Sequence, residues 1–255
     1  MSMNLSFLYG RRRLQRAFAR IHRTTLLGLG FGQDNLQTNG ELALVRRLSA
    51  QWPANPTLLD VGANRGDWTL AALDVVPGAV VYALEPSADP YTELASRVGT
   101  AARTFQVGLS SAPSTLTLWS PPGLSGLGSV YHRDLRAVGL DATSSTTIAV
   151  TTLDAFCAEQ RIDRIHLLKL DVEGHELAVL QGASRLLADG SIDAIQFEFG
   201  GANLDARTYL RDFRDLLEPV GFTLHRLLRD GVATAFAGEE QMEIFHYCNY
   251  VALRS

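Results

Sequence analysis

The chain has 255 residues, of which 46% are apolar, and this is enough to bury a full core within one α/β domain. Its net charge of −4 disfavours nucleic acid as a partner, and no apolar run approaches the ~20 residues that a membrane span requires. The two cysteines, Cys157 and Cys248, are too few for a disulfide framework and stand in apolar contexts, so we expect both in the core.

The first 23 residues carry a charge of +6 without a single acid, whereas the rest of the chain has 17 basic and 27 acidic residues. Leu14, Phe18 and Ile21 have helical spacing, so we expect residues 1–40 to be a basic helical extension of a domain that spans 41–255. Such a helix can lie on an anionic membrane surface. The alternative is that it packs on the domain or on a second subunit of a homo-oligomer. We expect a cytoplasmic protein, and membrane contact would make it peripheral.

The next elements form the pattern of a nucleoside site. A helix is predicted over Glu41–Leu48, and an apolar strand then ends in Asp60-Val61. A glycine-rich turn and a helix over Trp68–Leu73 follow. A second strand, Ala79–Leu84, ends in Glu85-Pro86. A carboxylate at that position can accept hydrogen bonds from both hydroxyls of a ribose.

The glycine turn indicates which nucleoside is bound. A dinucleotide site needs a middle glycine where this chain has Asn64, between Gly62 and Gly66, and no P-loop lysine follows. Asp60 and Asp67 would repel phosphates. A ligand with an amino group and no phosphate suits this turn, and S-adenosylmethionine has that character. A nicotinamide-dependent reductase and a non-catalytic nucleoside-binding module are the alternatives.

Strands continue to alternate with helices along the chain, which predicts a parallel sheet with helices on both faces. The last two strands are expected to close the sheet as an antiparallel pair. Helices are expected at Pro90–Val98, Leu177–Leu187 and Tyr209–Leu217. Strands are expected at Thr104–Val107, Leu116–Trp119, Ile148–Thr152, Ile165–Leu170, Ile192–Phe199, Phe222–Leu228 and Ile244–Leu253.

The segment Ser120–Ser129 is rich in glycine and proline, so we expect a long loop without regular structure. Loops of this kind in compact domains are often lids over a site. A disordered hairpin connection is the alternative.

Titratable residues gather where the strand Ile165–Leu170 ends: Lys169, Asp171, Glu173 and His175. The other 22 basic residues, apart from histidines, are all arginine, so Lys169 is the single lysine. An ammonium responds to burial in ways that a guanidinium cannot, which points to a role for Lys169, with a structural salt bridge to Asp171 or Glu198 as the alternative. Asp171 is the leading acid, and His175 is either a general base or a solvent-facing helix residue.

Glu198 alternates with Phe197 and Phe199 on the next strand, so it should face the side of the sheet opposite to them. The candidate catalytic residues are therefore Asp171, Lys169, His175 and Glu198. Asp171, Glu173 and Glu198 are also possible ligands for a divalent cation, but their spacing matches no strong metal motif, and we expect no metal.

These residues resemble the FkbM-type S-adenosylmethionine-dependent methyltransferases over roughly Thr57 to Leu228. The resemblance is carried by the glycine turn, Leu84-Glu85-Pro86, Leu109-Ser110, Thr152-Leu153-Asp154, Leu168–Glu176 and Val179–Ala183. It implies the Rossmann-like class I fold, with a seven-stranded, mostly parallel sheet. Asp60, Gly62 and Asn64 would then face the methionine end of the cofactor, Glu85 its ribose, and Leu109 its adenine. Gly66 and Pro86 are also expected in the cofactor site.

The resemblance further implies methylation of a hydroxyl on a sugar, a glycan or another small molecule. A hydroxyl is a poor nucleophile, so a base must remove its proton as the methyl group is transferred. Asp171 and His175 are the candidates for that base. Lys169 would orient the acid or stabilise negative charge on the acceptor, and the loop Ser120–Ser129 would exclude water.

Overall fold

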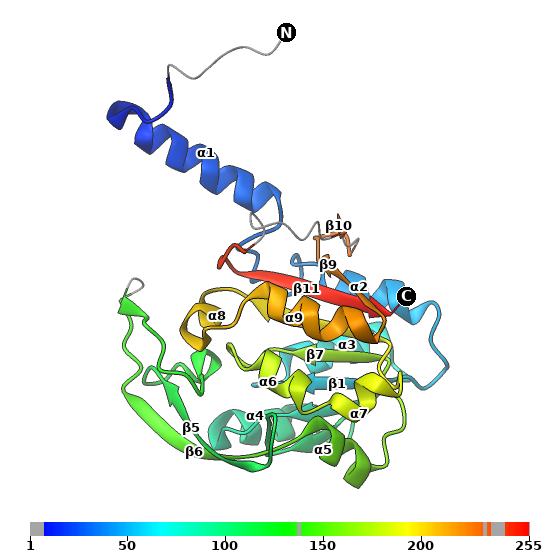
Figure 1. Ribbon diagram of the computed structural model, residues 1–255. Coiled ribbons are helices and arrows are strands. Elements are labelled where there is room, and N and C mark those ends of the chain that lie inside the picture. The colour runs from blue at the N-terminus through cyan, green and yellow to red at the C-terminus, as the bar shows by residue number, and fades with distance from the viewer. Residues whose placement is uncertain (1–7, 137–138, 232–233, 236–242, 255) are drawn as a thin grey trace.

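The computed structural model describes residues 8–136, 139–231, 234–235 and 243–254. Its main sheet has the strand order β10-β9-β11-β8-β7-β1-β2-β3 (Figure 1). The strands are β1 (Thr57–Val61), β2 (Val80–Leu84), β3 (Arg103–Phe105), β7 (Leu167–Leu170), β8 (Ala194–Phe199), β9 (Phe222–Arg226), β10 (Thr234–Ala235) and β11 (Cys248–Arg254).

Five adjacent strands, from β8 to β3, are parallel, and β11 runs antiparallel between β8 and β9. With the two-residue β10 set aside, this is the predicted seven-stranded, mostly parallel sheet with its closing antiparallel pair. The prediction of an α/β, Rossmann-like fold is therefore confirmed.

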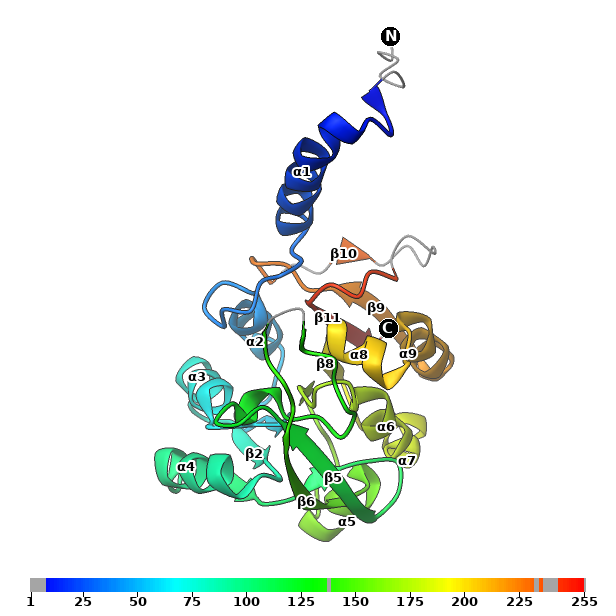
Figure 2. The same cartoon turned by 90° about the vertical axis from the view of Figure 1, so that its left-hand side faces the viewer.

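Helices cover both faces of the sheet, as Figures 1 and 2 show. Side chains of a strand alternate between faces, so Leu58 packs with one helical layer and Leu59 with the other. The first layer contains α2 (Glu41–Ser49), α3 (Asp67–Val75) and α4 (Ala88–Val98). The second contains α5 (Leu153–Gln160), α6 (Glu176–Gln181), α7 (Ser184–Ala188) and α9 (Leu210–Leu217).

A smaller three-stranded sheet lies beside the main one (Figure 1). It is formed by β4 (Gly108–Leu109), β5 (Ser114–Ser120) and β6 (Ser144–Thr151). The glycine-rich loop that follows β5 contains the short 3-10 turn η3 (Ser125–Leu127). Its far end is fixed by Ser129, which exchanges two backbone hydrogen bonds with Trp119 at 2.7 and 2.9 Å. This end of the loop is therefore ordered, contrary to the alternative of a disordered connection.

Several predicted boundaries are wrong for local reasons. The expected helix Leu177–Leu187 is two helices, α6 and α7, because Gly182 ends the first, and a Cβ there would lie 2.1 Å from the carbonyl oxygen of Ser110. Helix α5 was not predicted, although Thr152 caps it by accepting a hydrogen bond from the backbone N–H of Ala155 at 3.0 Å. Helix α8 (Gly201–Ala206) also follows from no pattern in the sequence.

The basic N-terminal helix is α1 (Gln15–Gly28), preceded by the turn η2 (Arg12–Leu14). It has no buried residue and stands away from the sheet and its helices (Figures 1 and 2). Phe31, three residues after its end, is 1% exposed and belongs to the main core. Within the described residues, no helix has the length and apolar character to cross a membrane.

Candidate active site

A cavity opens at the carboxyl ends of β1, β2 and β7, where parallel strands of an open sheet present their ligands. Of the residues singled out in the sequence, the cavity is lined by Gly62, Asn64, Glu85, Pro86, Leu109, Asp171, Glu173 and His175. Four others do not line it: Asp60, Gly66, Lys169 and Glu198. The structure thus brings residues of the glycine turn and Glu85 together with the titratable residues that follow the strand Ile165–Leu170. Some members of each group lie behind the cavity wall.

Glu85 is fixed at the end of β2 by the backbone around it. One carboxylate oxygen accepts from the N–H of Asn64 at 3.0 Å, and the other from the N–H of Ser87 at 2.8 Å. Burial raises the pKa of Glu85, and these N–H groups oppose that shift. The carboxylate lines the cavity with lone pairs still available, which suits the binding of a diol.

Asn64 occupies the position where a dinucleotide site has glycine. Its φ of 46° is left-handed, a conformation that asparagine tolerates better than most residues. Its side-chain oxygen is buried and has no hydrogen-bond partner within the described structure. An unpaired acceptor in a cavity wall is costly unless a ligand supplies a donor, and an ammonium group would do so. This observation fits the amino group of S-adenosylmethionine.

The remaining wall of the cavity is apolar and comes largely from the small sheet and the loop after β5. It consists of Val107, Leu109, Leu118, Val130, Ile148 and Val150. Gly126 in the loop lies over Asn64, since a Cβ on it would be 2.9 Å from the amide nitrogen of Asn64. The segment expected to be a lid therefore contributes to the wall, and the apolar surface is suited to the flat face of a purine.

The four residues that do not line the cavity have other surroundings. Gly66 precedes α3 with a φ of 85°, and a Cβ there would lie 2.7 Å from Leu94 of α4. It is therefore required for helix packing. Asp60 was expected to face the methionine end of the cofactor, but it is completely buried beneath the turn, where its carboxylate accepts from the hydroxyl of Thr69 at 2.6 Å.

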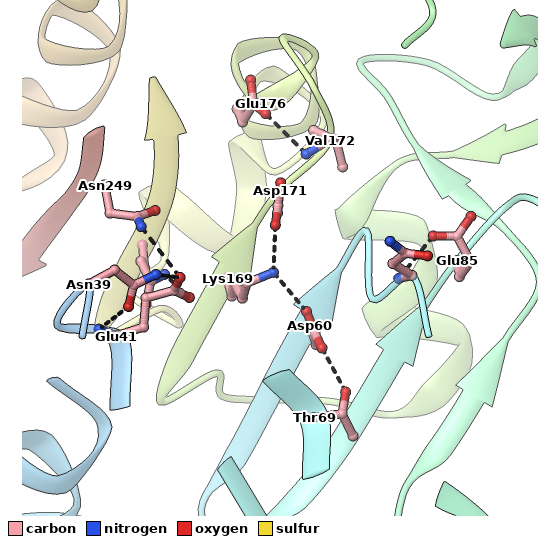
Figure 3. Close-up of polar contacts among 12 residues, drawn as sticks. Asn39, Glu41, Asp60, Thr69, Glu85, Lys169, Asp171, Val172, Glu176 and Asn249 are labelled. Atoms are coloured by element: carbon pink, nitrogen blue, oxygen red, sulfur yellow. Dashed lines mark hydrogen bonds and ion pairs between the residues drawn. The ribbon is translucent and has the colours of Figure 1, made fainter. Parts of the chain in front are cut away.

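Asp60 belongs to a polar row that crosses the sheet on the face covered by α2 and α3. Asp60 on β1 lies opposite Lys169 on β7, and Lys169 lies opposite Gln196 on β8. Two residues beyond Gln196 on the same strand, Glu198 lies opposite Asn249 on β11. Period-two alternation puts Asp171 and Glu198 on this face as well. The row explains why these strands are not apolar throughout (Figure 3).

Lys169 is the central cation of the row. Its Nζ donates to Asp60 at 3.3 Å and to Asp171 at 3.2 Å, and the residue is 5% exposed. Burial alone would lower its pKa, but the carboxylates of Asp171, Asp60 and Glu41 raise it above the usual range. Lys169 is therefore a permanent ammonium that joins the buried Asp60 to Asp171 at the cavity (Figure 3).

Asp171 has a second acidic partner behind the cavity wall. Glu198 lies near enough to Asp171 for the charge of one carboxyl to act on the other. Burial, together with the neighbouring Asp171, Glu173 and Glu176, raises the pKa of Glu198 well above its ordinary value. Asp171 lines the cavity, and 40% of its side chain is exposed.

The residues that complete this network were not predicted from the sequence. Glu41, at the start of α2, accepts from the side chain of Gln196 at 2.6 Å and from that of Asn249 at 3.4 Å, and also from Asn39. Burial raises the pKa of Glu41, although the charge of Lys169 opposes that shift. Glu41 has the sequence position of an ordinary acid in the first turn of a helix, and only the packing of α2 on this face of the sheet brings its charge near Lys169.

His175 lines the cavity but has both ring nitrogens engaged. Nε2 lies 2.9 Å from the hydroxyl of Ser110, and Nδ1 lies 3.1 Å from the hydroxyl of Tyr131. Burial lowers the pKa of His175 to about 4, so the ring is neutral at physiological pH and is a weak proton acceptor. Ser110 follows Leu109, so His175 lies towards the end of the cavity that the resemblance assigns to adenine.

Glu173 forms an ion pair with Arg133, and both side chains are mostly buried. Its φ of 53° is left-handed, so the chain turns sharply just after Asp171. Burial raises the pKa of Glu173, and Arg133 opposes that shift. Asp171, Glu173 and Glu198 were considered as metal ligands, but within the described residues no group of three or more such side chains is arranged to hold a metal ion.

Glu176, the first residue of α6, is 1% exposed. One of its oxygens accepts from the N–H groups of Val172 and Gly174 at 3.0 and 3.2 Å, and the other has no partner within the described structure. Burial raises its pKa from 4.5 to about 7. The unfolded chain therefore loses this proton at a lower pH than the folded protein, so Glu176 makes folding less favourable as pH rises from about 4.5 to about 7.

Substituting Glu176→Gln removes this ionisation. The free energy of unfolding of the variant, relative to the wild type, is expected to increase by up to about 3 kcal/mol between pH 4.5 and pH 7.5. Urea denaturation across this pH range measures the difference. Glu93→Gln, on the exposed surface, is the control and should give a constant difference. A constant difference for Glu176→Gln as well would contradict the raised pKa.

Comparisons with known proteins agree with this geometry. The family model described as the methyltransferase FkbM domain matches residues 60–224, which include every strand end that lines the cavity. The solved structure of methyltransferase FkbM from Methylobacillus flagellatus KT is similar with a TM-score of 0.50 and 15% identity, covering 78% of this chain and 44% of that one. At this identity the similarity concerns the fold alone.

Two curated proteins are similar in sequence. Methyltransferase sdnD of Sordaria araneosa is 29% identical over 161 residues, which are 52% of this chain and 62% of that protein. Hexuronic acid methyltransferase AglP of Haloferax volcanii is 27% identical over 164 residues, which are 63% of this chain and 64% of that protein. The chain thus spans less than two thirds of the length of each.

Proposed function

Because the chain belongs to the FkbM methyltransferase family, we propose that it transfers a methyl group from S-adenosylmethionine to a hydroxyl oxygen of a sugar, a glycan or a related small molecule. The observation that carries this proposal is that one cavity is lined by both Glu85, which suits a ribose, and Asp171, which suits a proton acceptor. Similarity to a hexuronic acid methyltransferase favours a sugar as the acceptor.

The residues at the end of β2 and in the glycine turn would hold the cofactor. Glu85 would accept from the ribose hydroxyls, and the unpaired oxygen of Asn64 would accept from the amino group. Leu109 and the apolar residues of the small sheet would cover the adenine. S-adenosylmethionine, when bound, supplies an electrophilic methyl carbon attached to a sulfonium, and the carboxylates of the cavity favour that positive charge.

Asp171 would act as the general base. The acceptor hydroxyl gives its proton to the Asp171 carboxylate as the new oxygen–carbon bond forms and the carbon–sulfur bond breaks. Lys169 does not line the cavity, so it is a positioning residue that holds Asp171 through the 3.2 Å contact. Asp171 is one of the charges that raise the pKa of Glu198, so the two carboxyl groups disfavour being charged together.

Glu85 provides a direct test of the cofactor. Glu85→Gln replaces one of two acceptor oxygens with a donor, so binding of S-adenosylmethionine is expected to weaken by about 10- to 100-fold. Isothermal titration calorimetry measures this, with Glu93→Gln as the exposed control. Tight binding of NADPH and none of S-adenosylmethionine would instead support the reductase alternative.

The acceptor can be found with the purified protein. Incubation with S-adenosylmethionine and a panel of hexoses, uronic acids and their glycosides, followed by mass spectrometry, identifies any methylated product. NMR spectroscopy then distinguishes an O-methyl ether from a methyl ester or an N-methyl group. A product methylated on nitrogen or carbon would contradict the proposal.

A further inference from the structure

Helix α1 separates two kinds of side chain onto opposite sides. Phe18, Ile21 and Thr25 follow one another at intervals of three and four residues, which places them along one side of the helix, and Leu14 of η2 precedes Phe18 by four residues. Arg16, Arg20 and Arg23 repeat at four and three residues. At 100° per residue, the arginine stripe is roughly opposite the apolar stripe. The helix is therefore amphipathic, with one apolar face and one cationic face.

Neither face is covered by the domain. All residues from Gln15 to Thr25 are exposed, including Phe18 at 36% and Ile21 at 59%. The helix extends away from the sheet and its two helical layers in both views (Figures 1 and 2). Only Leu26, near the end of α1, packs against the main core, and it is partly buried. An apolar stripe on a soluble helix marks a surface for a partner.

The charge of this segment indicates what kind of partner it is. The first 23 residues carry a charge of +6, and no acidic residue precedes Asp34 in the sequence. Pairing α1 with the same helix of a second copy would cover the apolar stripe but would leave both arginine faces without an acidic partner. An apolar stripe combined with excess positive charge suits a partner whose surface carries anionic groups over an apolar interior.

We propose that α1 binds the surface of an anionic lipid bilayer, with Phe18 and Ile21 inserted between the lipids and the arginines attracted to the headgroups. The segment that directly follows α1 is held against the domain by two contacts. Phe31 is buried under the guanidinium of Arg226, 5.0 Å from the ring centre, and the N–H of Gly32 donates to the carbonyl of Tyr247 at 2.7 Å. Binding through α1 would thus hold the methyltransferase domain close to the bilayer.

Vesicle co-sedimentation of the full chain tests this proposal. Strong binding is expected to vesicles that contain phosphatidylglycerol, with little binding to pure phosphatidylcholine and a loss at high salt. Arg16→Gln/Arg20→Gln and Phe18→Ser/Ile21→Ser should each weaken binding by about tenfold or more. The matched controls are Arg46→Gln/Arg161→Gln and Leu204→Ser, which change exposed arginines and an exposed leucine on the domain and should leave binding unchanged.

Every variant should retain wild-type affinity for S-adenosylmethionine, which separates this proposal from the proposed methyl transfer. Equal binding to neutral and anionic vesicles, or no effect of the α1 substitutions, would overturn it. Analytical ultracentrifugation supplies the remaining check. A dimer that Phe18→Ser/Ile21→Ser dissociates, without binding to vesicles, would assign the helix to a second copy of the chain.

Discussion

Replacing Asp171 with asparagine is expected to lower kcat by about 10²- to 10⁴-fold, while the affinity for S-adenosylmethionine stays within about threefold of the wild type. Asparagine has nearly the same shape but cannot take a proton from the acceptor. The measurement is release of S-adenosylhomocysteine in the presence of the acceptor that the panel identifies. Asp74→Asn, an exposed acid on α3, is the control and should retain full activity.

His175 is the other candidate for the general base, so the His175 variant is compared with the Asp171 variant. Its pKa of about 4 and its two engaged ring nitrogens make it a poor base, so His175→Gln should lower kcat by less than about tenfold. If His175→Gln abolished turnover and Asp171→Asn retained it, the assignment of the base would be reversed. If both variants retained turnover, the catalytic role of this strand end would be wrong.

The sequence predicted the parts of this site that depend on local pattern. A carboxylate after an apolar strand, as at Glu85, and titratable groups after another, as at Asp171 and His175, mark the carboxyl edge of a parallel sheet. Parallel strands bring such edges together, so the sequence alone predicts that residues more than 80 positions apart line one cavity.

The sequence pattern does not reveal which residues of neighbouring strands pair with each other. The polar network behind the cavity depends on this pairing. Asp60 faces Lys169 because Leu58 pairs with Leu167, and a shift of one strand by one residue would put the two side chains on opposite faces of the sheet. Glu41 joins the network only because α2 packs on that face. These contacts are set by how elements pack against one another, and spacing along the chain does not record them.

The single lysine of the chain is expected to be essential for stability. Lys169→Met should reduce the free energy of unfolding by about 3–5 kcal/mol, because it leaves the fully buried carboxylate of Asp60 without its cation. Asp171 suffers less, since 40% of its side chain is exposed and water can solvate it. Urea denaturation measures the loss, and Arg164→Met, which breaks an exposed ion pair with Asp193, should cost less than about 1 kcal/mol.

Two further variants distinguish lost charge from lost packing. Asp60→Asn/Lys169→Met removes both buried charges, so it should be at least about 2 kcal/mol more stable than Lys169→Met alone. Lys169→Arg keeps the charge but forces a larger planar group between Asp60 and the ring of Trp68, which lies 5.7 Å from Nζ, and should still cost about 1–3 kcal/mol. If Lys169→Arg were as stable as the wild type, the preference for lysine at this one position would have no structural basis.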